Sequence, residues 1–362
     1  MKLVIFGLTI SSSWGNGHAT LWRALCRALA ARGHDVTFFE QDRPYYAAHR
    51  DLHEMPGGRL VFYAAWEQVR PIAARELADA DAAIVTSYCA DALAAAELLG
   101  EANALRVFYD LDTPVTLDAL QTGRVDYLGP NGLAGYDLVL SYTGGSALDE
   151  LHTRLGARHV APLYGSVDPD VHRPATPHAR FFADLSYLGT YAADRQGTLE
   201  ALFIEPARCA RHRRFLIGGA QYPTDFPWQP NIFFVQHLEP AQHPAFFSSS
   251  RLTLNVTRRA MKAMGYCPSG RLFEAAACGA PVVSDWWEGL DQFFHPEKEI
   301  FVARGPEDVL RLLDLSDAEL TFAGRSARAR VLAEHTATHR AAELEQLLDE
   351  ARHAPQFAGT ER

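Results

Sequence analysis

The sequence predicts an α/β fold with two Rossmann-like domains that face a central cleft. Short apolar runs, typical of buried parallel strands, alternate with amphipathic helical patterns in both halves of the chain. The alternation breaks once, in a proline-containing stretch, and a chain of 362 residues suits two domains. We therefore predict an N-terminal domain over 1–165, a linker over 166–183, a C-terminal domain over 184–335 and a closing helix over 336–362.

The N-terminal half opens with a strand–loop–helix–strand unit, which is the usual start of a doubly wound sheet. The run 2–8 is fully apolar and predicts a central strand, and a helix over about 18–31 ends at Gly33 before a strand at 35–39. Helical patterns follow at 70–80, 91–99 and 148–155. The remaining strands of this half are predicted at 59–63, 82–86, 105–110, 138–141 and 159–163.

The same alternation restarts after the linker. Strands are predicted at 185–189, 215–217, 232–235, 252–256, 281–284 and 300–302. The predicted helices lie at 195–203, 240–247, 271–278 and 306–313, followed by long helical patterns from about 317 to 351. Ligands of open α/β sheets bind beyond the carboxyl ends of the strands, so we expect the site between the two halves.

Composition and charge exclude several classes of function. The net charge is −10 and the isoelectric point is about 5.8, which disfavours nucleic acid as a partner. The five cysteines are scattered without a CxxC pair, which argues against a disulfide framework or a zinc site. The chain shows neither a signal-peptide pattern nor a long apolar run, so we expect a cytoplasmic protein without an integral membrane segment. Its oligomeric state stays open.

The most informative segment is 267–285, CPSGRLFEAAACGAPVVSD. Ser269 can cap a short helix that ends at Gly279, and a buried strand follows. A helix N-terminus beside the small residues Ser269 and Gly270 favours an anion such as phosphate. Arg271 adds positive charge there, and Glu274, one turn into the helix, can accept hydrogen bonds from sugar hydroxyls.

This segment resembles the donor-site helix of group 1 glycosyltransferases, and so do the stretches 254–266 and 286–313. Three further stretches, 36–52, 108–117 and 187–196, resemble CgeB-type (spore maturation protein-like) glycosyltransferases. The resemblance implies a glycosyltransferase-B fold, in which the C-terminal domain binds a nucleotide sugar and the closing helix crosses back to the N-terminal domain. It implies transfer of the sugar to an acceptor hydroxyl without a metal or other cofactor, and it makes Glu274 the ribose ligand.

The first loop of the chain supplies a candidate base. Gly15 and Gly17 precede His18, and in the family this loop lines the cleft on the acceptor side. A helix N-terminus disfavours the imidazolium form, which suits His18 as a neutral general base. Two alternatives stay open: His18 as a loop or capping residue, and a dinucleotide site in which Glu40 would bind a ribose.

Two carboxylates follow the strand at 105–110. Asp110 and Asp112 are predicted at the carboxyl end of this strand, where they can bind the acceptor or act as the base. A turn-capping role for Asp112 ahead of Pro114 is the alternative.

Further donor-binding residues come from the resemblance. It assigns Gly189 and Tyr191 to a tight turn near the diphosphate, Arg195 and Lys262 to its charge, and His237 and Leu238 to the base. Arg258 is another candidate. Tyr266 replaces the first glutamate of the family's paired-glutamate motif, so the stereochemical outcome does not carry over. A same-fold nucleotide-sugar epimerase or a non-catalytic binding protein therefore remains an alternative.

Overall fold

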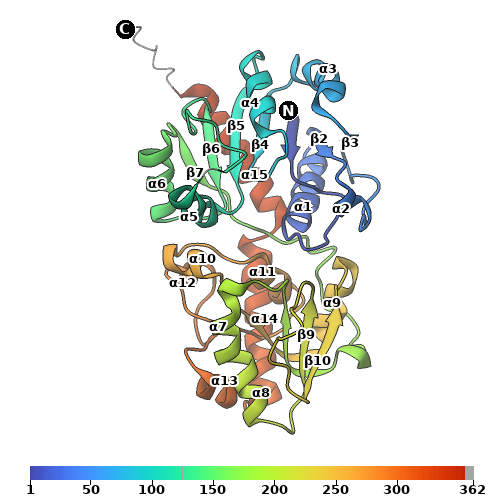
Figure 1. The fold of residues 1–362 in the computed structure, drawn as a ribbon. Coiled ribbons are helices and arrows are strands. Elements are labelled where there is room, and N and C mark those ends of the chain that lie inside the picture. Colours follow the sequence, from blue (N-terminus) through green and yellow to red (C-terminus); the bar gives the residue numbers. More distant parts are fainter. Residues whose placement is uncertain (124, 355–362) are drawn as a thin grey trace.

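A computed structural model describes residues 1–123 and 125–354 of the chain. It consists of two α/β domains, one stacked on the other, and the chain returns to the first domain for its last long helix (Figure 1). Each domain is built on its own parallel sheet.

The N-terminal sheet has seven parallel strands in the order β3-β2-β1-β4-β5-β6-β7. Alternate residues of the central strand β1 enter different cores: Leu3 and Ile5 pack on one face, and Val4 and Phe6 on the other. A strand covered by helices on both faces must be apolar throughout, which explains the run seen in the sequence. The strands are β1 (Lys2–Gly7), β2 (Asp35–Gln41), β3 (Arg59–Tyr63), β4 (Ala82–Thr86), β5 (Leu105–Asp110), β6 (Leu138–Ser141) and β7 (Val160–Pro162).

The helices of this domain cover both faces of the sheet (Figure 1). They are α1 (His18–Ala31), α2 (Pro44–Ala47), α3 (Trp66–Leu77), α4 (Ala92–Gly100), α5 (Thr113–Thr122) and α6 (Ser146–Leu155). The short helices α2 and α5 were not predicted. The order of the sheet reverses between β1 and β4, and the loop that follows β1 therefore lies where doubly wound domains bind ligands.

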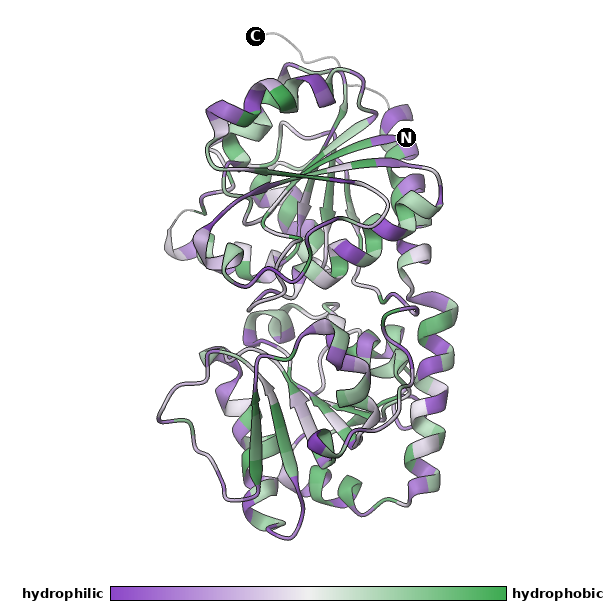
Figure 2. Cartoon of the chain, turned by 90° about the vertical axis from the view of Figure 1, so that its right-hand side faces the viewer, coloured by the Kyte–Doolittle hydropathy of each residue, from purple (hydrophilic) through white to green (hydrophobic). Residues whose placement is uncertain are grey.

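The C-terminal sheet has six parallel strands in the order β10-β9-β8-β11-β12-β13, and it reverses between β8 and β11. The strands of both sheets are mostly hydrophobic, whereas the helices that cover them show polar and apolar residues side by side (Figure 2). The strands are β8 (Ala183–Leu188), β9 (Phe215–Gly219), β10 (Ile232–Gln236), β11 (Ser250–Asn255), β12 (Val282–Ser284) and β13 (Phe301–Val302).

One predicted helix of this domain is longer than expected and changes type along its length. It continues from α7 (Gln196–Leu199) through a π-helical turn (Glu200–Ile204) into α8 (Glu205–Cys209). The short helices α10 (Arg259–Met264) and α12 (Leu290–Phe293) were not predicted. The other helices are α9 (His243–Ser248), α11 (Gly270–Ala277), α13 (Pro306–Leu313) and α14 (Asp317–Glu334).

The last helix, α15 (Ala337–His353), packs on α1 and belongs to the core of the N-terminal domain. Ser316 and Thr336 start α14 and α15 with capping boxes, so the chain breaks its helix for only two residues where it changes domain. Ala341, Leu344 and Leu348 are fully buried against the first domain. The predicted closing helix extended to 362, and 355–362 lie outside the described residues. None of the described helices has the length and apolar character needed to cross a bilayer.

Candidate active site

A cleft of about 480 Å³ lies between the two domains, within the usual size range of small-molecule sites. The N-terminal domain contributes the loop after β1, the start of α1 and the loop after β5. The C-terminal domain contributes the loops after β8 and β11 and the start of α11. Carboxyl ends of strands and amino ends of helices therefore meet at one place, as expected for a binding site in this architecture.

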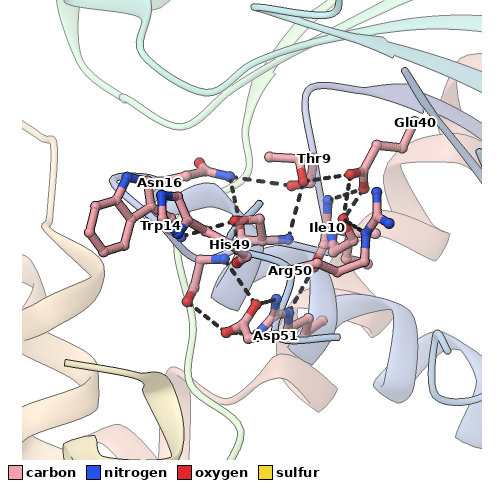
Figure 3. Close-up of polar contacts among 12 residues, drawn as sticks. Thr9, Ile10, Trp14, Asn16, Glu40, His49, Arg50 and Asp51 are labelled. Carbon is pink, nitrogen blue, oxygen red and sulfur yellow. Dashed lines mark hydrogen bonds and ion pairs between the residues drawn. The ribbon is translucent and has the colours of Figure 1, made fainter. Parts of the chain in front are cut away.

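Glu40 anchors the loop after β1 (Figure 3). Its carboxylate is fully buried and accepts hydrogen bonds from Thr9 Oγ1 at 2.8 Å, from the Ile10 amide at 2.8 Å, and from the amide and hydroxyl of Ser11 at 3.0 and 2.5 Å. The dinucleotide alternative required Glu40 to bind a ribose. The carboxylate is instead occupied by the loop, so that interpretation is not supported.

Asn16 fixes the start of α1. Its side-chain amide donates to the carbonyls of Thr9 and Ser12, both at 3.3 Å, and its carbonyl oxygen accepts from the amide of His18 at 3.0 Å. Gly15, with φ of 59°, turns the chain there, and Gly15 and Gly17 both line the cleft. His18 is thus the first residue of α1, as predicted, and the sequence analysis missed the role of Asn16.

His18 and Asp112 meet at the wall of the cleft. His18 Nε2 lies 3.4 Å from Asp112 Oδ2, and His18 Nδ1 is buried without a hydrogen-bond partner among the described residues. Burial alone would raise the pKa of Asp112, but His18, Arg258 and Tyr88 outweigh it and hold this pKa below its usual value. Asp112 precedes α5 without capping it, so its side chain serves the cleft and not the helix end.

Asp110 lies behind Asp112 and does not line the cleft. It is fully buried, and its Oδ1 accepts bonds from the Asp112 amide at 3.1 Å and from Thr116 Oγ1 at 3.0 Å. Burial raises the pKa of Asp110 to about 6. The structure thus separates the two predicted aspartates: Asp112 faces the ligand space, and Asp110 shapes the loop that carries Asp112.

The start of α11 forms the opposite side of the cleft. The Ser269 hydroxyl accepts the Arg271 amide, as predicted for a cap, and Ser269, Gly270, Arg271 and Glu274 all line the cleft. Arg271 Nη1 pairs with Glu274 Oε2, and Thr20 Oγ1 of α1 donates to Glu274 Oε1 across the domain boundary at 3.3 Å. Arg271 and two neighbouring histidines outweigh the effect of burial and hold the pKa of Glu274 well below its usual value.

The other predicted donor residues divide into two groups. Gly189, Tyr191 and Arg195 line the main cleft, and Arg195 Nε is buried without a partner among the described residues. His237 and Leu238 line a smaller recess of about 40 Å³ that adjoins Gly189. His237 has a φ of 45°, and its ring lies 4.5 Å from that of Trp14 in the first domain.

Of the two candidates Lys262 and Arg258, only Arg258 lines the cleft. Lys262 Nζ pairs with Asp285 at 3.2 Å, its side chain is 44% exposed, and it does not line the cleft. Arg258 does line the cleft, next to its ion-pair partner Asp194 at 3.0 Å. The predicted positive charge is therefore present at Arg195, Arg271 and Arg258, which precedes α10, and not at Lys262.

Tyr266 is wedged between the two domains. A β-carbon added to Gly145 or to Gly289 would lie 2.4 Å from its ring, so only glycine fits on either side. Its carbonyl accepts the amide of Gly144 at 2.9 Å. The residue that replaces the family's first glutamate is therefore a packing element at the boundary and not a wall of the cleft.

Two buried histidines surround Glu274, and the sequence analysis identified neither. His243 Nδ1 lies 3.4 Å and His172 Nε2 lies 3.9 Å from Glu274 Oε2. Burial lowers the pKa of His243, and it lowers that of His172 to about 4. The three residues come from the linker, α9 and α11, so no short sequence pattern connects them.

Comparisons with known proteins agree with this geometry. Residues 195–346 match the sequence family described as glycosyl transferase-like. The C-terminal part of the chain is thus a glycosyltransferase-like domain, and the CgeB-type subgroup is not confirmed. No curated protein matches the chain.

Solved structures share the whole fold. Sucrose-phosphate synthase from Thermosynechococcus elongatus is 15% identical with a TM-score of 0.66, over 98% of this chain and 100% of that one. Anabaena Alr3699/HepE in complex with UDP-glucose is 12% identical with a TM-score of 0.66, over 97% and 100%. An alpha-glucosyltransferase in complex with UDP is also 12% identical with a TM-score of 0.66, over 96% and 100%. These matches confirm the predicted fold with two Rossmann-like domains of the glycosyltransferase-B type.

Proposed function

We propose that this protein transfers a sugar from a nucleoside-diphosphate donor to an acceptor hydroxyl, without a metal ion. The observation that carries the proposal is the arrangement of charge across the cleft. Glu274 and Arg271 lie at the amino end of α11 in one domain, and the His18–Asp112 pair lies on the wall formed by the other. One side suits a nucleotide, and the other suits proton removal from a hydroxyl.

The donor lies against the C-terminal domain. Its diphosphate faces the amino end of α11, where free amide groups and the helix dipole favour negative charge. Arg195, Arg258 and Arg271 supply positive charge around the same space. When Arg271 turns to the diphosphate, Glu274 is released to accept hydrogen bonds from the ribose hydroxyls.

The base of the nucleotide lies against the turn that carries His237 and Leu238, at the mouth of the smaller recess. This recess adjoins the cleft through Gly189, which lines both spaces. A planar ring placed there contacts the backbone of the turn after β10, while the diphosphate reaches α11. The donor then spans the two spaces in one extended conformation.

The reaction takes place where the domains face each other. The acceptor hydroxyl loses its proton to the His18 imidazole, and Asp112 stabilises the imidazolium that forms. The hydroxyl oxygen bonds to the anomeric carbon as the bond from that carbon to the diphosphate oxygen breaks. Arginine side chains offset the charge that develops on the leaving diphosphate, and the two domains hold donor and acceptor together.

A panel of nucleoside diphosphates and nucleotide sugars tests this function. UDP and UDP-glucose enter first, because structural neighbours were solved with them. We expect one nucleotide to raise the melting temperature by mass action, and its sugar conjugate to be hydrolysed or transferred. Interconversion of the sugar without hydrolysis or transfer would establish an epimerase, and a thermal shift without turnover would establish a binding protein. The absence of a shift with every nucleotide would refute the donor site.

A further inference from the structure

Three ligand-type side chains converge beneath the donor site. His172 from the linker, His243 from the first turn of α9 and Glu274 from α11 are 4%, 2% and 3% exposed. The proposed glycosyl transfer uses only Glu274. The two imidazoles have no part in it, although burying them beside a carboxylate is costly unless they form specific bonds.

The three facing atoms form a nearly equilateral triangle. His172 Nε2 lies 3.5 Å from His243 Nδ1, His243 Nδ1 lies 3.4 Å from Glu274 Oε2, and Glu274 Oε2 lies 3.9 Å from His172 Nε2. A point about 2.1 Å from all three atoms exists inside this triangle, and this distance is the bond length of Zn²⁺ to imidazole nitrogen and carboxylate oxygen.

The hydrogen bonding of His243 presents a lone pair to this point. Its Nε2 lies 3.2 Å from the carbonyl oxygen of Leu238, which can only accept, so Nε2 carries the proton and Nδ1 does not. A backbone carbonyl that fixes the second ring nitrogen is the usual support of a metal-bound histidine. The unprotonated Nδ1 then faces a carboxylate oxygen, and a positive centre between them removes the repulsion.

We propose that His172, His243 and Glu274 form a binding site for Zn²⁺. Two neutral imidazoles and one carboxylate are a donor set that this ion takes with a fourth position left open. His243 and Arg271 line the small recess of about 40 Å³, which has room for a water molecule at that position and gives the ion a route from solvent.

Occupation by Zn²⁺ changes the partner of Glu274. The ion replaces Arg271 as the counter-charge of this carboxylate, and Arg271 turns away toward the cleft. Glu274 is then unable to bind a ribose, so Zn²⁺ and nucleotide exclude each other. This second statement rests on the proposed function, whereas Zn²⁺ binding itself does not.

Titration of the full-length, chelator-treated protein with Zn²⁺ tests the site. Competition with a chromogenic chelator should reveal one tight site per chain, and X-ray absorption should show two nitrogen ligands and one carboxylate ligand at about 2.0–2.1 Å. His172→Gln and His243→Gln should each weaken that site at least tenfold, since even loss of a supporting outer residue costs about that much. His212→Gln, an exposed histidine of the same domain, is the matched control and should bind as the wild type does.

The possible outcomes test the Zn²⁺ site and the proposed glycosyltransferase function separately. Wild-type affinity in both His172→Gln and His243→Gln, with native circular dichroism, would overturn the proposal, and so would the lack of a saturable site in the wild type. Zn²⁺ should raise the apparent Kd of UDP in the wild type and leave it unchanged in His172→Gln. A chain that binds Zn²⁺ at this site but no nucleotide would refute the donor site and retain the metal site.

Discussion

The imidazole of His18 and the carboxylate of Asp112 lie 3.4 Å apart on the cleft wall, although they belong to the ends of different strand–loop units. His18 begins α1, which follows β1, and Asp112 follows β5. Strand β4 separates β1 from β5 in the sheet, so the two loops converge above its carboxyl edge. The pairing gives His18 an oriented partner that can stabilise its protonated form.

His18→Ala should lower turnover about a hundredfold or more, because general base catalysis contributes that much, and it should leave donor affinity nearly unchanged. Asp112→Asn should lower turnover by a smaller factor, and the double variant should resemble His18→Ala, since residues that act as a unit are not additive. Steady-state kinetics with calorimetric nucleotide binding provides the measurement. Near-normal turnover of His18→Ala would return His18 to a purely structural role.

Glu274→Ala should weaken nucleoside diphosphate binding by about tenfold or more, because charge-assisted hydrogen bonds contribute roughly 1.5–3 kcal/mol. Glu274→Gln should lose a similar factor, although it keeps the volume of the side chain and so disturbs the histidines less. Calorimetry measures the Kd, and Glu239→Gln, an exposed residue of the same domain, is the control. An unchanged Kd in both Glu274 variants would remove this residue from the site.

Arg195→Ala should weaken nucleoside diphosphate binding about tenfold, while Lys262→Ala should leave it unchanged. Arg195 lines the cleft with a free Nε among the described residues, whereas Lys262 points to Asp285 outside the cleft. The same titration compares the two variants with the wild type. An effect of Lys262→Ala equal to that of Arg195→Ala would show that the helix α10 moves into the cleft when nucleotide binds.

Asp110→Asn should stabilise the protein increasingly as the pH rises from 4 to 7. The pKa of Asp110 is raised to about 6 in the folded state, so the folded chain favours the protonated form, and stability falls as the pH rises through that value. Asparagine removes this loss, which is at most about 3 kcal/mol for a shift of about two units. The difference in melting temperature between variant and wild type, measured across this pH range, checks the sign. A difference in melting temperature that stays constant across this pH range would show that Asp110 does not titrate within it.

Turnover should survive EDTA, because arginine side chains around the cleft supply the positive charge that a diphosphate requires. Added Zn²⁺ should inhibit instead of activate, since it competes for Glu274. The assay is sugar transfer or hydrolysis after dialysis against chelator. Complete loss of turnover that Mn²⁺ or Mg²⁺ restores would reverse this prediction and make Asp112 a candidate metal ligand.

Local patterns predicted the parts of the site that a single segment encodes. One short segment holds Ser269, Gly270, Arg271 and Glu274. Its cap, its helix and the polar end of that helix can therefore be predicted from the sequence directly. The order of strands and helices was also readable, because buried parallel strands are apolar throughout and the helices between them are amphipathic.

The features of the site that the sequence did not predict depend on contacts between residues far apart in the chain. His172 precedes Glu274 by 102 residues and His243 precedes it by 31, and nothing in their own segments marks them as partners. The direction of a side chain on a short helix was equally hidden, which is why Lys262 was assigned to the cleft and Arg258 was left as an alternative. Asp110 and Asp112 look equivalent in sequence, and only the packing of β5 buries the first.

The two chain segments that cross between the domains are bonded to each other. The amide of Val167 donates to the carbonyl of His335 at 3.1 Å, and the amide of Ala337 donates to the carbonyl of Val167 at 2.8 Å. The domains are therefore connected by one pair of hydrogen-bonded segments and not by two independent linkers. Sliding one segment past the other would break both bonds, so this paired linkage restricts how the domains can move relative to each other.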